Sequence, residues 1–143
     1  MSTITSANAQ FAIIIPGVYN APQILKGFAT DDAFLTEAVE NAETKMGVDG
    51  KLSAGFVFNP TIQNVVFQAD SPSLDVFNNW QLAQLAGREV ISCSATITIR
   101  SIGYSYVLTN GYLTQFKPMP DAKKTLQQVQ HRLTWEKIIG AKI

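Results

Sequence analysis

The strict alternation of apolar and polar side chains limits the fold of this sequence more than any other feature. From Ile91 to Ile99 every odd position is apolar or small, and every even position up to Arg100 is polar. The segment Gln128–Glu136 repeats the pattern, with its odd positions on the apolar side. Successive side chains of a β-strand point to opposite faces, so each segment predicts a strand with one buried and one wet face.

Other segments also predict extended structure. They are Gln10–Ile15, Pro22–Ala29, Thr36–Lys45, Lys51–Asn59 and Ile62–Ala69. Gly47–Gly50 predicts a turn between its flanking strands. Asn110-Gly111 separates Tyr104–Leu108 from Tyr112–Phe116 and suits a two-residue hairpin turn, because both central residues of such a turn need positive φ. We therefore expect a hairpin at Asn110.

One segment departs from the alternation and predicts a helix over Pro72–Ala86. Ser71 is placed as the N-cap, Pro72 at the first helical position and Asp75 near the positive end of the dipole, with Gly87 as the stop. The sequence therefore predicts an all-β fold with one α-helix and two packed antiparallel sheets, as a β-sandwich or barrel. Residues 1–143 form one domain, with residues 1–9 as a candidate extended arm.

The charge balance excludes several classes of protein. Eleven Lys and Arg balance eleven Asp and Glu, and only 15% of residues are charged while 46% are hydrophobic. This composition excludes a disordered polyelectrolyte and argues against a basic nucleic-acid binder. The sequence has one Cys, no apolar run of roughly 20 residues and no signal-peptide pattern at its start, so we expect no disulfide framework, membrane span or secretion signal. A net charge near zero favours association.

The zero net charge is a cancellation between two halves. Residues 1–75 carry eight acids and three bases, and residues 76–143 carry three acids and eight bases. Pairing within one chain would cancel these charges. Alternatively, stacked copies would present an acidic face to a basic face, which would set their orientation.

Few residues suggest chemistry, and we expect no catalytic, metal or cofactor site. His131 and Cys93 each lie on the apolar face of a strand, which favours packing roles over a general base or a reactive thiol. The acidic residues Asp31, Asp32, Glu37, Glu40 and Glu43 occur together with no base among them. They allow three interpretations: a hydrolytic carboxylate pair, a solvated strand edge, or an acidic surface that repels nucleic acid.

In the order of its elements the sequence resembles the tail tube proteins of contractile-tailed bacteriophages, and more distantly the secreted ring protein of type VI secretion systems. The stretches that carry the resemblance are Met46–Gly50, Gln68–Pro72, Leu74–Trp80, Gly87–Cys93 and Leu133–Ile139. The resemblance covers nearly the whole chain, and its specificity lies in the order of these stretches. It implies that copies form six-membered rings whose strands join into a continuous inner barrel, and that the rings stack into a tube inside a sheath.

The resemblance also implies a location, partners and candidate surfaces. The protein would belong to the phage tail of a virion assembled in the host cytoplasm. It would contact other copies of itself and the tail sheath, baseplate and tape-measure proteins. Double-stranded DNA would pass through the lumen without specific binding, and no membrane or cofactor would be involved. Pro22–Lys45 and Ile91–Phe116 are the candidate inner-barrel hairpins.

Site residues follow from the same resemblance. The lumen-facing candidates are Asp31, Asp32, Glu37, Glu40 and Glu43; the inter-ring loop candidates are Met46, Gly47, Asp49, Gly50 and Lys51; the inter-subunit candidates are Arg100, Lys137 and Lys142. Residues 1–9 and 137–143 are further candidate contacts. Two alternatives remain open: another role on the same fold (a tail terminator, baseplate hub or secreted ring protein), and a hydrolytic or small-molecule-binding domain built on the acidic cluster.

Overall fold

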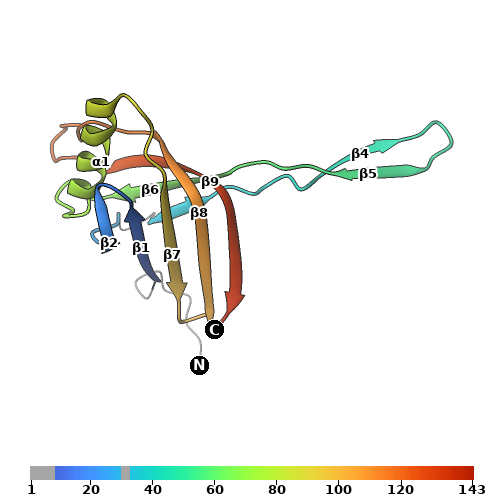
Figure 1. The fold of residues 1–143 in the computed structure, drawn as a ribbon, viewed down its shortest axis with the longest axis horizontal. Coiled ribbons are helices and arrows are strands. Elements are labelled where there is room, and N and C mark those ends of the chain that lie inside the picture. The colour runs from blue at the N-terminus through green and yellow to red at the C-terminus, as the bar shows by residue number, and fades with distance from the viewer. Residues whose placement is uncertain (1–8, 30–32) are drawn as a thin grey trace.

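A computed structural model describes residues 9–29 and 33–143 of the chain (Figure 1). The elements follow the order β1 (Ala9–Ile15), β2 (Tyr19–Ile24), β3 (Phe34–Thr36), β4 (Ala42–Met46), β5 (Leu52–Phe56), β6 (Thr61–Phe67), α1 (Leu74–Gly87), β7 (Cys93–Ile99), β8 (Tyr104–Gln115) and β9 (Val129–Lys142). The predicted all-β fold with one helix is confirmed for this part of the chain.

Most strands belong to one antiparallel sheet that curls around its own core. Its order is β2-β1-β7-β8-β9-β6-β3. Phe11 of β1 and Phe34 of β3 lie far apart in that order, yet their rings meet edge to face with centroids 5.7 Å apart. After β2, the Leu25 N–H donates to the Phe11 carbonyl oxygen and Phe28 bridges to Phe67 of β6. The segment after β2 thus joins the β1 side to the β6 side, and the sheet has the form of a small barrel.

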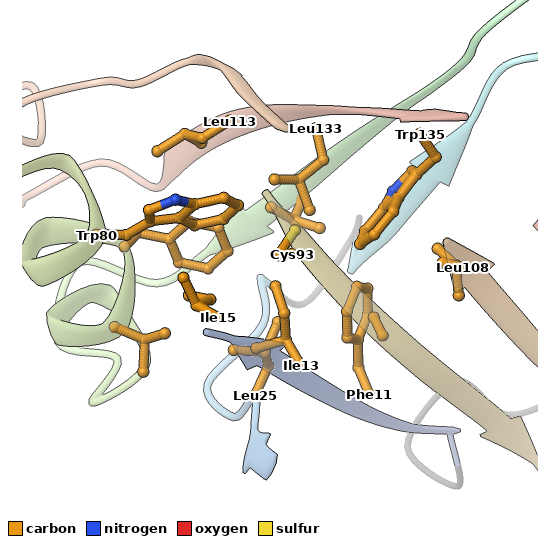
Figure 2. Close-up of a cluster of buried hydrophobic side chains, with 14 of the residues drawn as sticks. Phe11, Ile13, Ile15, Leu25, Trp80, Cys93, Leu108, Leu113, Leu133 and Trp135 are labelled. Carbon is orange, nitrogen blue, oxygen red and sulfur yellow. The ribbon is translucent and has the colours of Figure 1, made fainter. Parts of the chain in front are cut away.

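The core lies inside this curled sheet and under α1 (Figure 2). The alternation predicted for β7 and for the first half of β9 is confirmed, because Cys93, Ala95 and Ile97 are buried and Leu133 and Trp135 are fully enclosed. The helix contributes a second fully buried indole, Trp80, whose Nε1–H donates to the Ile91 carbonyl oxygen at 3.0 Å. These contacts fix α1 across one end of the barrel (Figure 1).

The predicted N-cap of the helix is wrong. The helix begins at Leu74, Ser73 occupies the capping position, and the Ser73 side chain makes no capping hydrogen bond. The Ser73 hydroxyl oxygen instead accepts from the Lys26 N–H at 2.6 Å, and the Ser71 hydroxyl donates to the Lys26 carbonyl oxygen. Both serines therefore tie the start of the helix to the chain after β2. The helix ends at Gly87, one residue beyond the predicted Ala86, and Arg88 instead of Gly87 takes the left-handed conformation, with φ 54°.

The predicted hairpin turn at Asn110-Gly111 is also wrong, because β8 runs through both residues. The turn between β7 and β8 lies at Arg100–Gly103. Asn110 does have positive φ, 48°, but it forms a bulge where the pairing with β7 shifts register. The ring of Trp135 covers Gly111 from the neighbouring strand β9. In this fold Asn110-Gly111 therefore forms a bulge within the long strand β8, packed against Trp135, instead of a turn between two strands.

The second antiparallel sheet does not pack on the first. It consists of β4 and β5 alone, which form a hairpin that projects away from the barrel past β9 (Figure 1). The extended segment predicted at Thr36–Lys45 is divided between β3 and this hairpin. Pro22–Lys45, expected as an inner-barrel hairpin, therefore spans parts of three strands that do not pair with one another. Ile91–Phe116 does contain a hairpin, β7–β8.

Candidate assembly surfaces

The projecting hairpin has one apolar face and one polar face. Cross-strand pairs place six side chains on the apolar face: Ala42 opposite Phe56, Thr44 opposite Ala54, and Met46 opposite Leu52. Glu43, Lys45 and Ser53 lie on the other face. Every residue of β4 and β5 is exposed, with Met46 at 65%, Leu52 at 58% and Phe56 at 69%. A two-stranded hairpin is marginally stable by itself in water, so this apolar face is suited to a partner.

The predicted inter-ring loop forms the tip of this hairpin, and the structure brings its five residues together. The Gly47 N–H donates to the Lys51 carbonyl oxygen at 2.8 Å, and the Gly50 N–H donates to the Gly47 carbonyl oxygen at 3.0 Å. The Asp49 carboxylate accepts from the Lys51 N–H at 3.2 Å. Gly50 has φ 85°, which favours glycine at this corner. Val48, between Gly47 and Asp49 in the turn, has a fully exposed side chain.

A second surface is the unpaired edge of β9. Its pairing with β6 ends at Trp135, while its pairing with β8 continues to Lys142. In the described part of the chain, residues 136–142 therefore offer backbone N–H and C=O groups on one side without a strand to receive them. The strands β1, β7, β8 and β9 are consecutive in the sheet, and β1 lies at the other side of this group from β9. At the start of β1, Ala9 and Gln10 extend beyond the register with β2 in the described part of the chain. Open edges of this kind are templates for pairing with another chain.

The outward face of β1, β7, β8 and β9 is broad and almost free of charge. Cross-strand registers place these side chains on it: Gln10, Ala12, Thr96, Thr98, Ser105, Val107, Thr109, Lys137, Ile139 and Ala141. Lys137 is the one charged residue among them, and Arg132 lies on the same face further toward the start of β9. Arg100 lies in the β7–β8 turn and Lys142 pairs with Tyr104, so these two bases share the end of the barrel opposite α1.

The predicted acidic cluster is not assembled into a site in the described residues. Asp31 and Asp32 lie outside them. Glu37 follows β3, with its N–H donating to the Ile62 carbonyl oxygen, and Glu40 lies in the connector to the hairpin. Glu43 is on the polar face of the hairpin, and all three glutamates are exposed. Within residues 9–29 and 33–143 no group of three or more His, Cys, Asp or Glu is placed to hold a metal ion.

His131 lies inside the core, as predicted. Its ring stacks between Phe77 at 4.8 Å and Phe116 at 5.0 Å, and its Nδ1 accepts from the Lys117 N–H at 3.3 Å. Among the described residues no hydrogen-bond partner reaches its Nε2. Burial lowers the pKa of His131 to about 4. The imidazole is therefore neutral at physiological pH and serves as a packed aromatic ring.

Cys93 is expected to be unreactive in the native protein. The side chain is 3% exposed, and burial raises the pKa of its thiol to about 12, so the reactive thiolate is scarce at pH 7. Mass spectrometry after maleimide treatment should find Cys93 unlabelled in native protein and labelled in denaturant. A Val48→Cys variant, exposed at the hairpin tip, supplies a positive control. Labelling of native Cys93 as fast as that of the control would contradict this packing.

The alternation that forms the hairpin's apolar face is visible in the sequence, and both flanking strands were predicted, yet the candidate inter-ring residues were limited to Met46–Lys51. Ala42, Thr44 and Met46 alternate before the turn, and Leu52, Ala54 and Phe56 alternate after it. The open edge of β9 has no such signal, because a strand's sequence does not show which of its edges is paired.

Comparisons with known proteins relate this chain to phage-tail proteins. The model of the family described as tail fiber protein gp32 matches residues 2–139. The chain belongs to this family. No curated protein matches the sequence. The described part of this family member contains no helix that is long and apolar enough to cross a membrane.

Solved structures with the same fold come from contractile injection systems. A chain of the sheath-tube complex of the PVC extracellular contractile injection system aligns with TM-score 0.59 and 13% identity, over 94% of this chain and 89% of that one. A chain of the anti-feeding prophage baseplate aligns with TM-score 0.59 and 11% identity, over 99% and 98%. A chain of the anti-feeding prophage tube terminating cap gives TM-score 0.59 and 10% identity, over 100% and 93%. The predicted contractile-tail tube fold is confirmed.

Proposed function

We propose that this protein is a non-enzymatic subunit of a contractile tail, and that it self-assembles into stacked hexameric rings that form the inner tube. The observation that carries the proposal is the projecting hairpin, which exposes a one-sided apolar face. The tail-protein family and the shared tube fold support it. The net charge of zero also favours association of copies.

The open edges support closure of a ring. Neighbouring strands in β1-β7-β8-β9 are antiparallel, so β1 and β9 run in opposite directions. The free edge of β9 in one copy can therefore pair antiparallel with the start of β1 in the next. Each copy would then add four strands to one continuous barrel, and closure would remove the exposed edges. Lys137 and Lys142 belong to this part of β9, and their role as inter-subunit residues stays a prediction.

In this arrangement the outward face of the four strands lines the bore. Its side chains are mainly hydroxyl-bearing or apolar and include few charges, among them Lys137 and Arg132, which offers a passing polymer few adhesive contacts. Arg100 would lie at the rim of the bore. Glu37, Glu40 and Glu43 lie outside these four strands, and their placement facing the lumen stays a prediction, as does that of Asp31 and Asp32. We propose that the phage genome passes through this bore, and that sheath, baseplate and tape-measure proteins are the partners.

An alternative is a role at one end of the tube or in an isolated ring. The matches to chains of a baseplate and a terminating cap favour a terminator or hub as this second candidate. Electron microscopy of the purified protein separates the two, since a main tube subunit gives long uniform tubes and an end component gives single rings. A monomer that persists across concentration and salt, with neither tubes nor rings, would contradict both.

Charges on the apolar face of the hairpin should prevent assembly. In the double variant Met46→Glu/Leu52→Lys we expect at least a 100-fold higher concentration for half-assembly by light scattering, because each side chain contributes about 1.5–3 kcal/mol when buried. The matched control Glu43→Gln/Lys45→Gln alters the polar face and should assemble normally. Both variants should melt like the wild-type monomer, since the hairpin does not pack on the barrel. Normal tubes from the first variant would show that this face is not an interface.

A further inference from the structure

The end of the barrel opposite α1 contains an apolar cavity, which we call the barrel mouth. Its volume is about 290 Å³, and it is lined by Phe34, Thr36, Gln63, Ile97, Ile99, Tyr106 and Ile138. The two polar residues in this wall bond to protein groups. Gln63 donates through Nε2 to the Thr36 hydroxyl at 3.2 Å and accepts through Oε1 from the Trp135 indole N–H at 3.1 Å. The mouth therefore presents a mainly apolar surface and is suited to apolar side chains.

The same chain carries a protruding group of matching chemistry. Met46, Val48 and Leu52 surround the tip of the hairpin and are all exposed. An apolar cavity of about 150 Å³ accommodates one benzene-sized group, so the mouth has room for about two side chains of this size. Figure 1 shows the tip held far from the barrel, so the tip of one copy does not reach the mouth of that copy.

We propose that the barrel mouth of one copy receives the hairpin tip of a second copy. This inference rests on the proposed self-assembly and specifies its receiving site. A protruding tip and a distinct mouth form two different surfaces, and when they join successive copies head to tail the contact is heterologous and generates rings or filaments. Repetition of this contact buries an exposed tip and fills an apolar mouth in every copy.

Charge at the two surfaces fits the same contact. Arg100, which follows the lining residue Ile99, and Lys142, near the end of β9, lie at the same end of the barrel as the mouth, and Glu37 follows the lining residue Thr36 on its other side. Asp49 lies at the outermost corner of the hairpin, beside Lys51. A docked tip brings the Asp49 carboxylate toward two cations, which orients the contact while apolar burial supplies most of its free energy. In this contact an acidic residue of the first half of the sequence, Asp49, lies near basic residues of the second half, Arg100 and Lys142, that belong to another copy.

The contact is tested with two single-cysteine variants that are mixed, so that any heterologous bond joins different copies. Val48→Cys places a thiol at the tip, and Ile99→Cys places one in the mouth; native Cys93 is buried and is expected to take no part in the oxidation. The chains carry tags of different mass, are assembled together and are oxidised mildly. We expect the mixed disulfide at least ten times more often than in the control mixture of Val48→Cys with Asn79→Cys, whose thiol is exposed on α1 at the opposite end.

Each outcome of this test bears on the proposal. Assembled tubes or rings with no excess of the tip-to-mouth disulfide overturn the receiving site and leave self-assembly intact. Absence of both assembly and disulfide overturns the receiving site together with the proposed function. Should Ile99→Cys fail to fold by circular dichroism, Tyr106→Cys supplies the mouth thiol instead, with the same expected excess.

Discussion

Replacement of Gly111 with alanine is expected to lower the free energy of unfolding by about 3 kcal/mol, a large effect for a single added methyl group. A Cβ at position 111 would overlap the six-membered ring of Trp135, which lies directly opposite on β9. Trp135 is fully buried, and its indole N–H donates to the side-chain amide oxygen Oε1 of Gln63. The ring therefore has no free space into which it can move, and the overlap must be relieved by distorting both strands.

Urea denaturation followed by circular dichroism measures this effect on the unassembled protein. Gly55→Ala is the matched control, because Gly55 is also in a strand and a Cβ there meets nothing within 4 Å; its stability should change by less than about 0.5 kcal/mol. In the double variant Gly111→Ala/Trp135→Phe the smaller ring relieves the overlap, so the two losses should be less than additive. Strict additivity, or a Gly111→Ala protein as stable as wild type, would contradict the packing described.

The strands that the sequence predicted best are those with one buried face. In β7 and the first half of β9, burial of alternate side chains requires apolar residues at every second position, and this requirement appears directly in the sequence. The helix was predicted because its segment departs from the alternation, and Val76, Phe77 and Trp80, its buried residues, do recur at helical spacing. Its start was misplaced by two residues because the hydroxyls of Ser71 and Ser73 bond to Lys26, a contact between distant segments.

Asn110-Gly111 shows why local signals alone could not predict the rest. The dipeptide favours positive φ, and Asn110 has it, but a bulge and a hairpin turn use the same conformation. The choice between them depends on Trp135, which packs against Gly111 from another strand. The candidate inter-ring site was also predictable only in part. Residues 46–51 were correctly placed at a turn, but the sequence does not show that the hairpin projects from the barrel, because this depends on where β3 and β6 pair.

Acidification is expected to destabilise the protein through His131. The His131 side chain is 2% exposed between Phe77 and Phe116, and burial lowers its pKa to about 4, from about 6.5 in an unfolded chain. Below pH 6.5 the unfolded chain binds a proton that the folded protein excludes. Stability is therefore fully present above pH 6.5, is lost as the pH falls toward 4, and changes no further through this group below that value. The total loss is about 3 kcal/mol.

The variant His131→Phe separates this effect from the titration of the carboxylates, which both proteins share. Phenylalanine keeps an aromatic ring in the stack and removes the titrating group, along with an Nε2 that finds no hydrogen-bond partner among the described residues. Asp75 and Lys117 line the small cavity beside the ring and are unchanged in the variant. Urea unfolding at pH 7 and pH 4.5 should therefore show a larger loss for wild type than for His131→Phe. Equal losses would mean that His131 is protonated within the fold, and that its stacked, desolvated environment is not as described.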